Sequence, residues 1–393
     1  MPGFIPFRAL RYAPGADLSA VIAPPYDVLS DADVDALAAR DPHNIVHIDV
    51  PRGGPDRYDV AAATMARWVD EGVLVADGQP SFTIYRMSFT DATGARRTIA
   101  GVLGGLAVVD EGAGGVLPHE RTTPKAKTDR LDLTRATHAN LSPVWGLSLA
   151  SGLTQELAQP GEPLGSVCVD GVEHAVERVS DPERIARIEA ILNADDVLIA
   201  DGHHRYAISR TYRDEVRAAT GRKDTDAEYT LTFVNELVDD QLSIEAIHRL
   251  YSGVGFEELA QRLAGCFDLS PAPAPTPATL AQMVEQGRLV LLSPDGSAQW
   301  LTPKPGAFDG VRALDGAWLE HALDGLDAQI DYQHGLDEML AAVRSGGHTA
   351  GILIRPTSLA EIRRTAREGL LMPPKSTFFT PKLRTGLVIR PTA

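Results

Sequence analysis

The sequence predicts a mixed α/β protein, in which helices and strands are interleaved around a mixed sheet. A predicted helix, a short apolar strand, a tight turn and a second helix follow one another between Asp181 and Arg213. Two strand-like runs, residues 81–89 and 97–109, are joined by a turn. The 393 residues, with 44% hydrophobic and 23% charged side chains, have a globular composition and can bury a sizeable core.

Charge and composition exclude several kinds of partner. A net charge of −16 argues against coating nucleic acid or an anionic membrane. No apolar run approaches the length of a membrane span, and residues 1–6 do not resemble a signal peptide. The two cysteines, Cys168 and Cys266, lack metal-ligand spacing and suit a reducing compartment. We therefore expect a cytoplasmic protein with neither a nucleic-acid nor a membrane partner.

A rigid turn lies near the N-terminus. Pro24 and Pro25 fix an extended backbone just before Tyr26 and Asp27. Asp27 is either a site residue or part of this turn. Ser30 is a candidate N-cap of the next helix.

The next elements are a predicted strand and a predicted helix. Residues 45–50 alternate between apolar and polar side chains, which predicts a half-buried strand with His47 and Asp49 on one face. Residues 58–72 have the spacing of an amphipathic helix, and Gly72 is a natural stop.

Residues 117–130 are rich in polar and charged side chains that can act in catalysis or bind ligands. Glu120 lies near Lys125 and Lys127, so an ionised carboxylate there can act as a general base or bind Mg²⁺, and the lysines can bind phosphates. The alternative is a solvated run of charges before a helix over residues 131–139, which Thr128 or Asp129 can cap.

The most unusual segment is the turn after the apolar run 197–200, which predicts a buried strand. Five successive residues form this turn: Asp201, Gly202, His203, His204 and Arg205. A helix beginning here directs backbone N–H groups and its positive dipole end at the turn, which favours an anion. The turn therefore predicts a phosphate or nucleotide site; the alternative is a capped helix with a surface histidine pair. The glycine spacing of a P-loop is absent.

The remainder suggests a division of the chain. The proline-rich run 271–277 favours an extended segment, so we expect a catalytic core over residues 1–270 and a C-terminal α/β part over residues 278–393, unless both form one integrated domain. Three further polar residues, Asn235, Glu236 and His248, are either site groups or ordinary structural residues.

A proline-stiffened loop near the C-terminus carries several cations in an otherwise acidic chain. Lys375, Ser376, Lys382 and Arg384 suit an anionic ligand such as a phosphate or a carboxylate. The alternative is a C-terminal arm that docks on the rest of the protein.

Five motifs occur in the order typical of one family: APPYDV (23–28), PHN (42–44), PHERT (118–122), ADGHHRY (200–206) and MPPKST (372–377). The chain resembles the bacterial and archaeal family long called domain of unknown function ten-fifteen over nearly its whole length. The Asp-Gly-His-His-Arg turn is similar to that of free serine kinases with a ParB/sulfiredoxin-like fold. The resemblance implies a ParB/sulfiredoxin-like core with large additions.

The resemblance also implies an activity: a small-molecule kinase that transfers phosphate from a nucleotide to the hydroxyl of free L-serine, giving O-phosphoserine. Carried over by motif, the nucleotide phosphates are held by Asp201, Gly202, His203, His204 and Arg205. We expect His204 and Asp201 to act in catalysis with Glu120 as the candidate base. Mg²⁺ would be held by Asp201 or Glu120, with ATP or ADP as donor.

The amino-acid substrate needs one acidic and one cationic partner. Asp27, beside Tyr26, is a candidate for the amine, and Lys375 or Arg384 for the carboxylate. Two alternatives remain: a ParB-like switch that binds or hydrolyses nucleotide, and a non-catalytic anion-binding protein. The sequence does not choose among ATP, ADP and pyrophosphate as donor.

Overall fold

The computed structural model describes residues 1–91, 94–118, 129–373 and 375–392. Of residues 127 and 128 it describes the backbone alone. The chain divides into two compact units. Unit 1 comprises Met1–Thr90, Arg96–Leu242 and Pro381–Ala393, and unit 2 comprises Asp91–Ala95 and Ser243–Thr380. The proline-rich run 271–277 lies inside unit 2. The last segment of the chain belongs to unit 1.

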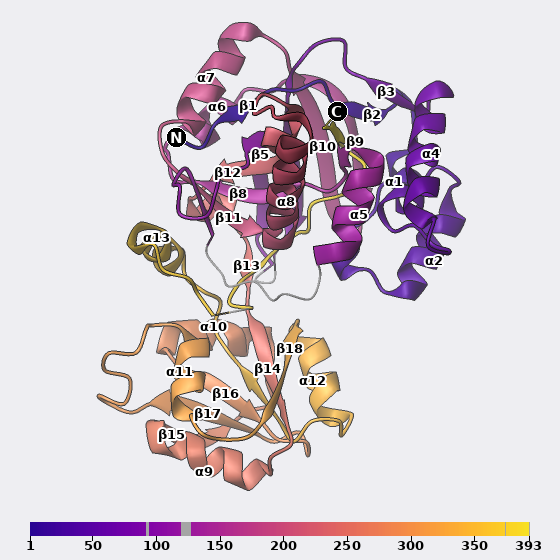
Figure 1. Cartoon of the computed structure of the whole chain (residues 1–393). Coiled ribbons are helices and arrows are strands. Elements are labelled where there is room, and N and C mark those ends of the chain that lie inside the picture. The colour runs from indigo at the N-terminus through magenta and orange to yellow at the C-terminus, as the bar shows by residue number, and fades with distance from the viewer. Residues whose placement is uncertain (92–93, 119–126, 374, 393) are drawn as a thin grey trace. The chain divides into compact units, whose positions relative to one another are not determined.

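Unit 1 is built on a mixed sheet, which within the described residues has nine strands (Figure 1). Along the sheet these are β6 (Val116–Pro118), β11 (Val197–Asp201), β8 (Val144–Ser148), β12 (Tyr229–Glu236), β5 (Arg96–Ala107), β4 (Phe82–Thr90), β10 (Val172–Val179) and β9 (Glu162–Val169), with β1 (Phe4–Ile5) beside β5. The pairs β6–β11 and β8–β12 are parallel and the others are antiparallel. The expected mixed α/β class is confirmed.

Helices and short elements complete unit 1: α1 (Leu18–Val21), η1 (Tyr26–Val28), α2 (Asp31–Arg40), α3 (Val46–Asp49), α4 (Arg57–Asp70), α5 (Lys127–Thr137), α6 (Leu153–Ala158), α7 (Pro182–Leu192), α8 (His203–Thr220), η3 (Asp226–Glu228) and η4 (Asp239–Gln241). Two small ladders pair β2 (Leu10–Tyr12) with β3 (Leu74–Ala76), and β7 (Ala139–Asn140) with β21 (Arg390–Pro391). Leu157 of α6, Ile188 of α7 and Val234 of β12 share one buried apolar cluster.

Unit 2 is built on an antiparallel sheet in the order β15 (Phe267–Ala272), β17 (Ala298–Pro303), β16 (Leu289–Leu292), β19 (Ala350–Leu353), β14 (Ile247–Ser252) and β18 (Gln329–His334). A short ladder pairs β13 (Ile244–Glu245) with β20 (Phe378–Phe379). Its helices are α9 (Phe256–Cys266), α10 (Pro277–Gln286), α11 (Asp315–Ala322), α12 (Leu336–Arg344) and α13 (Leu359–Glu368). Two apolar clusters form its core.

Most local predictions are confirmed. Asp181 caps α7 with Pro182 in its first turn, and Ser30 caps α2 through a capping box. The strand predicted over residues 45–50 is wrong, because this segment forms the single helical turn α3. Asn44 Oδ1 accepts the Val46 N–H at 3.1 Å, and this side-chain contact supports a turn instead of an extended backbone.

Candidate functional site

The candidate site begins where β11 ends. The register between β11 and β8 shifts between Ile199 and Asp201, which is a bulge of the kind that redirects a side chain. Gly202 then takes φ +84° and precedes the first residue of α8. A Cβ at Gly202 would lie 3.0 Å from Cζ and Nε of Arg205, so glycine is needed both for the backbone and for the packing of that guanidinium.

The Asp201 carboxylate is held by two cations. Lys382 Nζ lies 3.4 Å from Oδ1, and Arg205 Nη2 lies 2.9 Å from Oδ2. Burial alone would raise the pKa of Asp201, but Lys382, Arg205 and His203 outweigh burial and lower the pKa to about 2. Asp201 is therefore ionised at neutral pH.

Arg205 connects this turn to two other segments. Its Nη1 donates to the carbonyl of Pro143, and its Nη2 lies 3.7 Å from Oδ2 of Asp27. Its side chain is 9% exposed. Burial would lower the pKa of Arg205, but Asp27 and Asp201 outweigh it and raise the pKa, so the guanidinium is a fixed positive charge.

A second arginine lies on the same side of unit 1. The Arg130 guanidinium stacks over the Tyr26 ring with its Cζ 4.2 Å from the ring centroid. Arg130 Nη1 donates to the backbone carbonyl of Asp49 and lies 3.3 Å from Asp49 Oδ1. Asp49 is buried, and burial raises its pKa despite Arg130 and Arg205.

The structure brings together one group of predicted residues: Tyr26, Asp27, Asp201, Gly202, His203, His204 and Arg205. The two histidines open α8, where backbone N–H groups lack partners within the helix. Lys382, a cation of the C-terminal loop outside our substrate assignment, joins this group. Its partner Asp201 is 181 residues away in the chain, so local sequence patterns cannot reveal the pairing.

One further predicted substrate residue, Arg384, has different partners. Arg384 is buried, with Nη2 2.7 Å from Asp170 Oδ2 and Nε 3.4 Å from His174 Nε2. Lys375 belongs to unit 2. Glu120 and Lys125 lie outside the described residues, and Lys127 begins α5.

The remaining polar candidates have structural partners. Asn235 accepts the Trp145 indole N–H at 2.7 Å, and Glu236 accepts the backbone N–H groups of Gly152 and Thr154 at the start of α6. In unit 2, His248 Nδ1 accepts the Ile354 N–H at 3.2 Å, and burial lowers the pKa of His248 to about 4. These contacts support the structural interpretation of all three residues.

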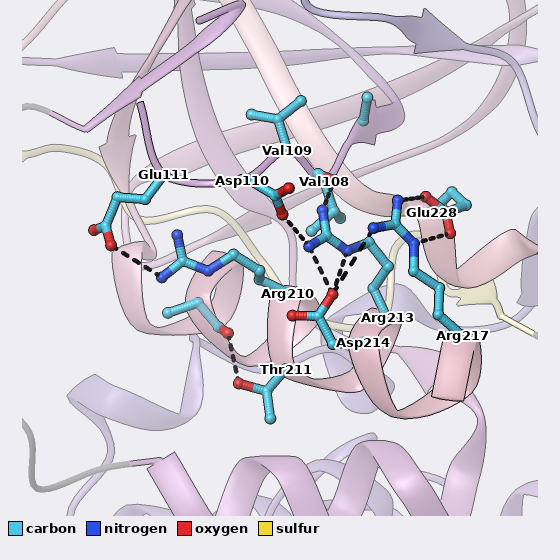
Figure 2. Close-up of polar contacts among 12 residues, drawn as sticks. Val108, Val109, Asp110, Glu111, Arg210, Thr211, Arg213, Asp214, Arg217 and Glu228 are labelled. Carbon is cyan, nitrogen blue, oxygen red and sulfur yellow. Dashed lines mark hydrogen bonds and ion pairs between the residues drawn. The ribbon is translucent and has the colours of Figure 1, made fainter. Parts of the chain in front are cut away.

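A row of arginines on α8 contacts carboxylates (Figure 2). Three ion pairs form the row: Arg210 with Glu111 at 3.8 Å, Arg213 with Asp110 at 2.5 Å, and Arg217 with Glu228 at 2.5 Å. Arg213 also donates to the carbonyl of Val108. These ion pairs therefore link α8 to neighbouring segments.

A cluster of metal ligands and a membrane-spanning helix are both absent from the described residues. No group of three or more His, Cys, Asp or Glu side chains in the described segments is arranged to hold a metal ion. Of the two residues expected to bind Mg²⁺, Asp201 and Glu120, the structure describes Asp201. Both its carboxylate oxygens already contact cations. Within these same segments, no helix combines the length and apolarity that crossing a bilayer requires.

Residues 4–317 match the family described as "Protein of unknown function (DUF1015)". The chain belongs to this family, which confirms the resemblance drawn from its motifs. No curated protein matches the sequence.

Solved structures give similarities at low identity. A conserved hypothetical protein from Pyrococcus furiosus is 13% identical with a TM-score of 0.37, over 70% of this chain and 92% of that one. A free serine kinase in complex with AMP is 13% identical with a TM-score of 0.37, over 70% and 89%. C-terminally truncated SbnI from Staphylococcus aureus is 13% identical with a TM-score of 0.39, over 73% and 87%. Likenesses at 13% identity and TM-scores below 0.5 assign no activity to this chain.

Proposed function

We propose that the protein is a small-molecule phosphotransferase that moves phosphate from a nucleotide to the hydroxyl of free L-serine, giving O-phosphoserine. The observation that carries this proposal is the pairing of Asp201 with both Arg205 and Lys382 at the beginning of α8. Phosphoryl transfer needs mainly positioning and neutralisation of charge, and this turn supplies cations beside helix N–H groups.

Each residue of the turn has a proposed task. The first-turn amides of α8, with His203 and His204, hold phosphate oxygens. Lys382 neutralises charge on the transferred group, and Arg205 holds the Asp201 carboxylate in position. Mg²⁺ that arrives with the nucleotide would have to replace one of the two cations on the Asp201 carboxylate, since Mg²⁺ commonly combines one or two carboxylates with substrate phosphates.

The acceptor is proposed to lie beside Arg205. In the reaction, the serine hydroxyl oxygen forms a bond to the terminal phosphorus while the bond from phosphorus to the leaving nucleotide breaks. The hydroxyl proton passes to a carboxylate base, for which Glu120 remains our candidate. Because Lys382 contacts Asp201 at the turn whereas Arg384 pairs with Asp170, we assign Lys382 rather than Arg384 to the anionic ligands.

The test is phosphorus NMR of the purified protein with Mg²⁺, ATP and L-serine. We expect a phosphoserine signal from the wild type and from Lys223→Ala, an exposed lysine outside the site. We expect its rate of appearance to fall at least about tenfold in Lys382→Ala and His204→Ala, because a hydrogen bond to a charged group contributes about 1.5–3 kcal/mol.

Absence of phosphoserine with ATP, ADP and pyrophosphate alike would contradict the proposal. Loss of ATP without serine, at the same rate whether or not serine is added, would instead favour a nucleotide-hydrolysing switch.

A further inference from the structure

A small cavity lies beside Arg205, within unit 1. Its volume is about 50 Å³, and its wall includes Tyr26, Asp49, Arg130, Ser142, Arg205 and Ser209. Tyr26, Ser142 and Arg205 are half-buried, while Asp49 and Arg130 are buried. A water needs about 10–15 Å³ on this measure, so the space suits a group the size of about four waters.

Opposite charges are built into this cavity wall. Arg205 contributes a positive charge, and its buried Nε has no hydrogen-bond partner among the described residues. Asp49 contributes a carboxylate whose Oδ1 lies 3.3 Å from Arg130 Nη1. Its Oδ2 lies 3.5 Å from Ser142 Oγ, at the long limit of hydrogen bonding, and so retains capacity for a closer donor.

We infer that this cavity binds the ammonium and carboxylate of a free α-amino acid, with Asp49 holding the ammonium and Arg205 the carboxylate. The inference deepens the proposed function and rests on it, because it takes the phosphate acceptor to be an amino acid. The ammonium, α-carbon and carboxylate match the available volume. Binding there leaves the side-chain hydroxyl to be directed toward the turn that holds phosphate.

Two physical arguments favour a zwitterion over a simple anion. A carboxylate ligand alone would be repelled by Asp49, whereas an ammonium on the same ligand offsets that repulsion. Burial raises the pKa of Asp49 despite Arg130 and Arg205, so a further cation beside the carboxylate would favour its ionised form. An ammonium supplies such a cation and a donor for Oδ2.

The test measures binding without nucleotide, by calorimetric titration with three ligands. L-Serine carries both charged groups, 3-hydroxypropionate lacks the ammonium, and ethanolamine lacks the carboxylate. We expect L-serine to bind the wild-type protein at least about tenfold more tightly than either partial analogue. Equal affinity for all three ligands would overturn the inference.

Asp49→Asn removes the proposed ammonium partner. We expect the ratio of the L-serine affinity to the 3-hydroxypropionate affinity to fall toward one in this variant. The matched control is Asp77→Asn, which also removes a buried carboxylate from an arginine, Arg11 at 3.0 Å, but lies outside the cavity and should keep the preference. An unchanged preference in a folded Asp49→Asn protein would overturn the inference.

If Asp49→Asn does not fold, Ser142→Val provides a second test. It keeps every charge of the cavity wall but adds bulk inside, so we expect L-serine affinity to fall at least about fivefold. Undiminished affinity would overturn the inference.

The phosphorus NMR result separates this inference from the proposed function. Phosphoserine formation with unchanged ligand preference in Asp49→Asn would overturn the cavity assignment alone. Serine binding that depends on Asp49, without phosphoserine formation, would support the cavity and overturn the kinase proposal.

Discussion

At the scale of single residues, the candidate site depends on a few side chains that the backbone places closely. Asp201 is ionised because Lys382 and Arg205 face its two oxygens. A Cβ at Gly202 would lie only 3.0 Å from the Arg205 guanidinium, which would have to shift slightly to accommodate it. The glycine thus has a chemical role in the site as well as a conformational one.

Gly202→Ala tests this double role, and Gly221→Ala is its matched control. Both glycines flank α8 with positive φ, +84° and +70°, but a Cβ at Gly221 would meet nothing within 4 Å. We expect each variant to lose about 1–2 kcal/mol of unfolding free energy from the left-handed backbone. Only Gly202→Ala should weaken nucleotide binding, by about tenfold or more, because Arg205 must move.

Urea unfolding and nucleotide titration measure the two effects. If both variants bound nucleotide equally well, the contact between Gly202 and Arg205 would not matter for the site.

At the scale of elements, α8 has two different roles. Its first turn contributes to the candidate site, and its arginine row holds it against neighbouring segments (Figure 2). The Arg213 side chain is 2% exposed and pairs with Asp110 and Asp214. A helix fixed in this way keeps its N-terminus in place for a ligand.

Arg213→Met should therefore lower the unfolding free energy by about 1–3 kcal/mol, since the Val108 carbonyl loses its donor. Arg222→Met is the control, because Arg222 is 62% exposed and pairs with exposed Asp224. An exposed pair contributes about 0–1 kcal/mol, so this variant should unfold like the wild type. Equal unfolding free energies in urea for the two variants would contradict the assigned role of Arg213.

At the scale of the whole molecule, each unit has its own apolar core. Within the described residues, clusters around Ile188 and Tyr212 in unit 1 share no residue with those around Leu263 and Met283 in unit 2. The candidate site and the proposed amino-acid cavity are both built from residues of unit 1. A loss of packing inside unit 2 should therefore leave the site chemistry intact.

Scanning calorimetry of two core variants tests this independence. Ile188→Ala in unit 1 and Leu263→Ala in unit 2 each remove a fully buried side chain and should cost about 2–5 kcal/mol. We expect two unfolding transitions, with each variant lowering a different one, and nucleotide affinity unchanged in Leu263→Ala. A single transition that both variants lower equally would show that the units unfold together.

The sequence by itself determined the local features of this protein. The apolar run, glycine and polar turn of residues 197–205 specify β11, the left-handed residue and the start of α8 through contacts within a few residues. The sequence also predicts the N-caps of α2 and α7 correctly. The strand predicted over residues 45–50 is wrong, because alternating polarity over so short a segment also fits one helical turn.

Only the tertiary structure decided which distant side chains meet. Lys382 reaches Asp201, while Arg384, two residues further along, turns to Asp170 and His174. Asp49 and Arg130 form a cavity wall with Arg205, although none of the three is near another in sequence. Such meetings depend on strand order, register and the return of residues 381–393 to unit 1, which are set by packing of the whole unit and not by local pattern.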